Sequence, residues 1–183
     1  MNRFSALIIG LSIFAVGCSD STPSAPTQGT TTTSTFTVPL SPANEVPAIA
    51  NADASASGTA IIALTVTKDG AGNVTSASAN FQISVNGFPA GTRVTDAHIH
   101  AAAAGSNGGV IVNAGLAAGE LVVSNGSGSV TKNGIAVPAD RAAAILNNRA
   151  GHYFNVHTAL NPDGAIRGQL SQGTFDPGTS VPY

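Results

Sequence analysis

Charged side chains are scarce in this sequence. Lys, Arg, Asp and Glu make up 9% of its 183 residues, and the formal net charge is -2. The sequence has no run of Lys or Arg that could neutralise the phosphates of DNA or RNA. Tryptophan is absent and aromatic residues are only 5% of the chain, which leaves few rings on which bases or sugars could stack. The composition therefore predicts no nucleic-acid partner.

Cysteine is nearly absent as well. Cys18 is the only one in the chain, so no intramolecular disulfide can form and the fold must be held by its core. A chain of 183 residues is long enough for one domain with such a core and for terminal tails. Gly, Ala, Ser, Thr and Val are abundant, a composition typical of short strands joined by tight turns.

The first residues have the pattern of a secretory signal peptide. A short polar start with one charge, Arg3, precedes the apolar run Ala6–Val16, which is too short to span a bilayer comfortably. Ala15–Cys18 resembles the lipobox of bacterial lipoproteins, although Ala15 stands where leucine is usual. The resemblance implies cleavage after residue 17 and lipidation of Cys18. The alternatives are an ordinary secretory signal with a stray thiol, or an uncleaved anchor.

Residues 18–35 are rich in Ser, Thr, Pro, Gly and Gln and lack an apolar period. Such a segment cannot bury enough surface to offset the entropy of ordering it, so we expect a disordered tether. Residues 173–183 form a polar C-terminal tail punctuated by prolines. We therefore expect a lipid-anchored domain at a membrane, facing away from the cytoplasm, in the periplasm or at the cell surface.

Short alternating segments separated by turn residues run through the rest of the chain. They predict strands at residues 36–40, 58–67, 74–85, 94–101, 110–112, 120–123, 128–131, 152–158 and 165–170. The turn clusters Lys68–Asn73 and Asn161–Gly164 predict hairpins, and residues 138–146 are the one predicted helix. We expect an all-β fold: an antiparallel Greek-key β-sandwich of immunoglobulin or superoxide dismutase type with one short helix.

Three motifs in this order resemble the CHRD domain, a module named from repeats in chordin. They are Leu40–Pro47, Ala97–His100 and Tyr153–Thr158, the last of which runs on through Asn161–Gly168. The resemblance covers about residues 36–172 and implies an extracytoplasmic β-module without enzymatic activity. In chordin the repeats belong to an extracellular antagonist of growth-factor signalling. What carries over is a binding or structural module, with an extracellular protein as a candidate partner.

All histidines of the chain lie in two of the predicted strands. His98 and His100 share one face of the first, and His157 shares a face with Tyr153 and Asn155 in the second. His152 has the opposite parity and joins them only if the strand carries a bulge. Imidazole clusters suit Cu(II), Zn(II) or Ni(II), so one hypothesis is a copper or zinc site at these histidines. The pair on one strand is similar to copper/zinc superoxide dismutase in arrangement only, and further ligands have no matching motif.

The other interpretation is structural, and the sequence favours it. A histidine beside Asp96, or one that donates to a carbonyl of the Gly-rich loop, can simply pin two strands together. Glu45 and Arg167 are expected to form an ion pair that ties the first loop to the last hairpin. The sequence shows no Ser/His/Asp order, paired carboxylates or phosphate-binding loop, and Asp96 with His98 lacks a nucleophile. We therefore expect a non-catalytic module first and a metal-binding protein as the alternative.

Overall fold

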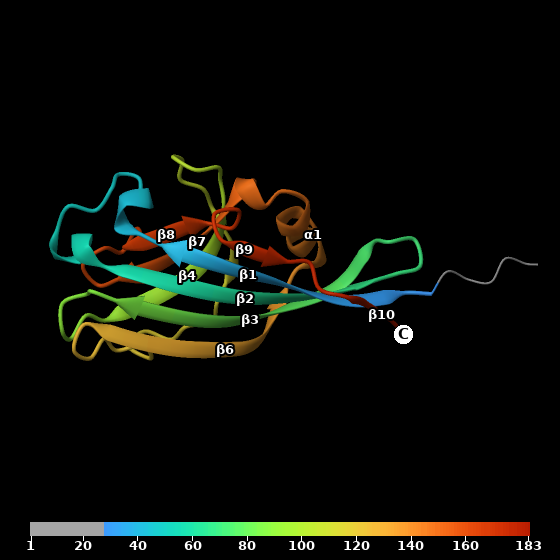
Figure 1. Cartoon of the computed structure of the whole chain (residues 1–183), viewed down its shortest axis with the longest axis horizontal. Coiled ribbons are helices and arrows are strands. Elements are labelled where there is room, and N and C mark those ends of the chain that lie inside the picture. Colours follow the sequence, from blue (N-terminus) through green and yellow to red (C-terminus); the bar gives the residue numbers. More distant parts are fainter. Residues whose placement is uncertain (1–27) are drawn as a thin grey trace, which may run out of the picture.

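The computed structural model describes residues 28–183 as ten strands, one α-helix and three short 3-10 helices. The strands are β1 Thr30–Leu40, β2 Ser57–Lys68, β3 Val74–Asn86, β4 Val94–Ala101, β5 Val110–Asn113, β6 Ser127–Val137, β7 His152–Thr158, β8 Ile166–Gln169, β9 Thr174–Asp176 and β10 Ser180–Pro182. One sheet has the order β10-β1-β2-β3-β6, with β9 also paired to β1; the other has the order β5-β4-β7-β8. The sheets lie face to face (Figure 1), which confirms the predicted antiparallel β-sandwich.

The core lies between the two sheets and follows the alternation of the strands. In β1, Phe36, Val38 and Leu40 are buried, while Thr37 and Pro39 between them face outward. Phe81 of β3 and Phe154 of β7 are fully buried and stack with their ring centroids 5.8 Å apart. Because these two strands belong to different sheets, this stack joins the two layers of the sandwich.

The predicted helix is present as α1, Ala139–Asn147. Ala142 and Ile145 are its buried residues, and the helix contacts β2 and β3. In the part of the chain that the structure covers, no helix is long and apolar enough to cross a membrane.

The pairing of β4 with β7 positions the polar residues of the second sheet. Ile99, Phe154 and Val156 point into the core. On the other face, Asp96, His98 and His100 of β4 stand opposite His157, Asn155 and Tyr153 of β7, in that order. Every residue of β7 is buried. Its polar face must therefore be covered by loops, and these loops shape the site described below.

The expected tether is partly wrong. β1 begins at Thr30, so Thr30–Thr35 belong to the fold, paired along their whole length with β2. β9 and β10, which lie in the expected C-terminal tail, pair with the other side of β1. Thr is common in tethers and strands alike, and here its β-branched side chains lie in a paired strand. The expected signal peptide, Cys18 and the first part of the tether lie outside the described residues.

The predicted strand at residues 120–123 is also wrong, whereas the predicted strand at residues 128–131 is present as part of β6. Residues 120–123 form no regular strand, and Val122 makes only an isolated bridge with Arg93. β6 instead pairs with β3 along most of its length, with one irregularity in the register. The strand β5 is four residues long and pairs with β4, and its Val110 is exposed. Long-range pairing with β3 thus overrides the local hairpin pattern.

Candidate functional site

Three of the four histidines converge on the outer face of the second sheet. His98 and His100 come from β4 and His157 from β7, and one ligand atom from each lies within 4.8 Å of the others. Nδ1 of His98 is 3.0 Å from Nε2 of His157. His100 and His157 are buried, and the side chain of His98 is 13% exposed. Parity gave only the face that each histidine occupies on its own strand, and the register of the two paired strands brings His98 and His157 side by side.

The second nitrogen of two of these rings is held by a backbone carbonyl. Nδ1 of His100 lies 2.9 Å from the carbonyl oxygen of Gly108, and Nδ1 of His157 lies 2.8 Å from that of Pro162. A carbonyl can only accept, so in both neutral rings the hydrogen is on Nδ1 and a lone pair is on Nε2. Nε2 of His100 is buried and has no hydrogen-bond partner within the described residues.

His98 has a different environment from the other two rings. Its Nε2 lies 3.1 Å from Oδ2 of Asp96 and 3.2 Å from Nδ2 of Asn113. Oδ1 of Asp96 accepts the backbone N–H of Ala97 at 2.8 Å, and Oδ1 of Asn113 accepts that of Gly115 at 2.6 Å. Both side chains are thus fixed in orientation by the backbone of their own strand or turn.

The three rings are poised to be neutral. Burial lowers the pKa of His98, His100 and His157 below the ordinary value of 6.5. The neighbouring imidazoles lower each pKa further, while Asp96 opposes the shift at His98 and the carbonyl of Gly108 opposes it at His100. A neutral imidazole is the form that binds metal, so this environment favours coordination without prior loss of a proton.

A comparison with known protein families identifies the family of this chain. The family model described as the CHRD domain matches residues 36–170. The chain belongs to the CHRD family. No curated protein and no solved structure matches it. The resemblance read from the sequence motifs is confirmed, and the CHRD domain is a family of non-enzymatic, binding-type domains.

The CHRD domain also brings Glu45 and Arg167 together. Arg167 is 3% exposed and Glu45 is 7% exposed, with Nε of Arg167 3.8 Å from Oε2 of Glu45. Burial raises the pKa of Glu45 from 4.5 to about 7, and the charge of Arg167 only partly offsets this. The carboxyl group packs against Gly164, where any Cβ would collide with it. This contact explains a glycine at that position of the last hairpin.

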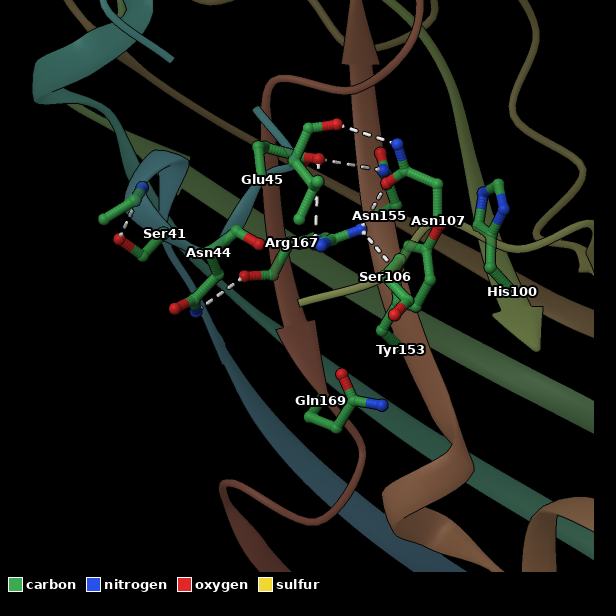
Figure 2. Close-up of polar contacts among 12 residues, drawn as sticks. Ser41, Asn44, Glu45, His100, Ser106, Asn107, Tyr153, Asn155, Arg167 and Gln169 are labelled. Atoms are coloured by element: carbon green, nitrogen blue, oxygen red, sulfur yellow. Dashed lines mark hydrogen bonds and ion pairs between the residues drawn. The ribbon is translucent and has the colours of Figure 1, made fainter. Parts of the chain in front are cut away.

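Arg167 anchors the loop between β4 and β5. Nη1 donates to the carbonyl of Ser106 at 3.2 Å and to Oδ1 of Asn107 at 2.9 Å, and Nε donates to the carbonyl of Asn44 at 2.5 Å. Figure 2 shows the guanidinium enclosed by these groups and by Glu45. The loop fixed in this way carries Gly108, whose carbonyl holds His100.

A stack of three side chains connects this buried ion pair with the histidines. The guanidinium carbon of Arg167 lies 4.5 Å from the ring centroid of Tyr153. The rings of Tyr153 and His100 are nearly parallel, with an interplanar angle of 6° and centroids 4.8 Å apart. Four buried side-chain atoms have no hydrogen-bond partner among the described residues: Glu45 Oε1, His100 Nε2, Asn155 Oδ1 and Arg167 Nη2. All four atoms lie in or beside this stack of side chains, where buried polar atoms without a hydrogen-bond partner are therefore concentrated.

His152 does not join the cluster. It stands opposite Ala101 on the other face of β7, and its Nδ1 lies 2.7 Å from the carbonyl oxygen of Asn148. Its role is structural, because this hydrogen bond links the start of β7 to Asn148. The sequence reasoning did not find Asn113, Gly108 or Pro162 as neighbours of the site. Asn113 could be found from the sequence only by assuming the register of the β4–β5 pair, in which it stands opposite His98. The groups of Gly108 and Pro162 are backbone carbonyls, which no side-chain pattern indicates.

Proposed function

We propose that this CHRD domain is a non-catalytic binding module for one transition-metal ion, zinc or copper. The ligands are Nδ1 of His98 and Nε2 of His100 and His157. The observation that carries the proposal is the convergence of these three imidazoles on one sheet face, with the remaining nitrogen of each facing a hydrogen-bond acceptor. Metal-binding histidines characteristically have such a partner, which fixes the ring orientation and the tautomer.

The distances fit a metal ion after small side-chain movements. Nitrogen ligands of tetrahedral zinc lie about 2.0–2.1 Å from the metal, which puts them about 3.3 Å apart. Nδ1 of His98 and Nε2 of His157 are already 3.0 Å apart. The widest pair of the three is within 4.8 Å, so it needs to close by at most about 1.5 Å, which ring rotations can supply. Three imidazole ligands suit zinc or copper.

The structural interpretation explains His152 better than it explains the cluster. Nδ1 of His152 has a backbone partner, the carbonyl oxygen of Asn148 at 2.7 Å, and His152 lies outside the cluster of the other three histidines. Nε2 of His100 is a buried acceptor with no hydrogen-bond partner among the described residues, which costs stability unless a ligand engages it. For His98, His100 and His157 we therefore place metal binding ahead of a structural role.

The proposed place of action is the cell envelope. The sequence Ala15–Cys18 after an apolar run supports a lipid anchor on Cys18, and a Ser- and Thr-rich segment would then connect the anchor to the domain. The binding-type character of the family supports a module that holds or delivers a ligand and does not transform it. A metal-binding module on a tether at a membrane surface combines these features.

Isothermal titration of Zn(II) and Cu(II) into the purified protein tests the proposal. We expect one ion per chain and at least a hundredfold weaker binding in His100→Gln and in His157→Gln. His152→Gln is the matched control, because it makes the same change on the same strand but on the other face. Circular dichroism confirms that each variant is folded. Absence of saturable binding by the folded wild-type protein, or equal binding by His157→Gln, would refute the metal site.

A further inference from the structure

His98 is the one histidine of the cluster whose outer nitrogen faces both a donor and an acceptor. Nε2 lies 3.2 Å from the amide nitrogen of Asn113 and 3.1 Å from a carboxylate oxygen of Asp96. A neutral imidazole nitrogen either donates or accepts, so it can satisfy only one of these two neighbours at a time. The two neighbours therefore prefer opposite tautomers of His98.

Asn113 favours the tautomer with the hydrogen on Nδ1. Its amide orientation is fixed, because Oδ1 accepts the N–H of Gly115 at 2.6 Å and so Nδ2 faces His98. Nε2 of His98 then accepts, and Nδ1–H donates to Nε2 of His157 at 3.0 Å. His157 continues this series of hydrogen bonds, because its own Nδ1–H donates to the carbonyl of Pro162 at 2.8 Å. The result is a continuous chain of hydrogen bonds in one direction.

Asp96 favours the other tautomer. In the chain just described, Oδ2 of Asp96 faces the lone pair on Nε2 of His98, so two acceptors lie 3.1 Å apart. A metal ion on Nδ1 of His98 requires the hydrogen to be on Nε2. In that form Nε2–H donates to Asp96, and the contact with Asn113 loses its hydrogen bond. The carboxylate is held ready for this role by the N–H of Ala97.

We infer that metal binding converts His98 from the Nδ1–H to the Nε2–H tautomer, with Asn113 stabilising the metal-free form and Asp96 the metal-bound form. The inference rests on the proposed metal site. The proton balance is zero, because Nδ1 gives up a proton to solvent and Nε2 takes one from it. Asp96 and Asn113 are positioning residues with opposite effects: one strengthens metal binding through the hydrogen bond to His98, and the other weakens it.

Substitutions of the two positioning residues should shift the metal affinity in opposite directions. In Asp96→Asn the N–H of Ala97 keeps the amide oxygen, so the amide nitrogen faces His98 and favours the metal-free tautomer. We expect Zn(II) binding to weaken about 10- to 100-fold, the range typical of such partners. Asn113→Ala removes the competing donor and should tighten binding several-fold. Weaker binding in both variants would indicate a merely structural role and would overturn the opposition of the two residues.

The decisive readout is the histidine tautomer itself, measured in the full protein by long-range nitrogen–proton NMR correlation above the histidine pKa values. We expect His98 to be Nδ1–H without metal and Nε2–H with Zn(II), whereas His100 and His157 remain Nδ1–H in both states. These two rings are internal controls. Zinc binding with an unchanged His98 tautomer would overturn the switch and leave the metal site intact. Absence of zinc binding would overturn the metal site and the switch with it.

Discussion

Replacement of Glu45 by Gln should remove a loss of stability that the wild-type domain shows as the pH rises through one defined window. Burial raises the pKa of Glu45 from 4.5 to about 7, so the folded protein holds this proton more tightly than the unfolded chain does. The contribution to stability is therefore complete below about pH 4.5 and is lost as the pH rises to about 7. Each pKa unit corresponds to about 1.4 kcal/mol, so the loss amounts to about 3 kcal/mol.

The assay is urea unfolding of the metal-free wild-type protein and of Glu45→Gln at several pH values between 4 and 9. Subtracting the free energy of unfolding of the variant from that of the wild-type protein leaves the contribution of Glu45, because all other titrating groups are common to both proteins. We expect the wild-type protein to lose about 3 kcal/mol relative to the variant between pH 4.5 and 7.5 and the difference to be constant above that.

Glu120→Gln is the matched control with the opposite sign. Glu120 is exposed, and the N–H of Ala117 and the ammonium group of Lys132 lower its pKa. Its contribution to stability is present above the ordinary carboxyl pKa of 4.5 and is lost only as the pH falls below that value, so the difference for Glu120→Gln should be nearly constant over the rest of the assay range. If the difference for Glu45→Gln does not fall between pH 4.5 and 7.5, attraction by Arg167 matches or outweighs burial. The reasoning about this buried pair would then be refuted.

Three further changes test the anchor and the packing. Cys18→Ser should release the protein from the membrane fraction and abolish incorporation of labelled fatty acid; unchanged retention would contradict the lipid anchor. Gly168→Ala should cost about 1–3 kcal/mol in urea unfolding, because its Cβ would collide with the carbonyl of Pro39, whereas Gly109→Ala has no atom within 4 Å and should be neutral. Phe154→Ala should cost about 3–5 kcal/mol, since the ring is fully buried against the other sheet. A cost below 1 kcal/mol would mean that this stack does not join the layers.

Alternation along single strands could be read from the sequence, and pairing between strands could not. The parity of β4 and β7 correctly grouped His98 with His100 and separated His152 from His157. The approach of His98 to His157 depends on a register between strands about fifty residues apart, for which the sequence holds no local signal. The same limit explains β6, which pairs with β3 and not with its neighbour in sequence.

Two further features of the structure could not be predicted from the sequence, one because it depends on backbone groups and one because composition is ambiguous. The carbonyls of Gly108 and Pro162 orient two of the histidines, but any residue has a carbonyl, so their role follows only from the fold. Thr30–Thr35 have the composition of a tether and the structure of a strand, because β2 on one side and β9 and β10 on the other pair with β1. Tertiary pairing decides the state of such segments.

A crystal structure of the zinc-loaded protein, with anomalous differences recorded at the zinc absorption edge, tests the metal site most directly. We predict one anomalous peak per chain about 2.0–2.1 Å from Nδ1 of His98 and from Nε2 of His100 and His157. The nitrogens of His100 and His157 that face Gly108 and Pro162 should keep their carbonyl contacts. A zinc peak only at surface carboxylates, or none at these three rings in zinc-soaked crystals, would contradict the assignment of this CHRD domain as a metal-binding module.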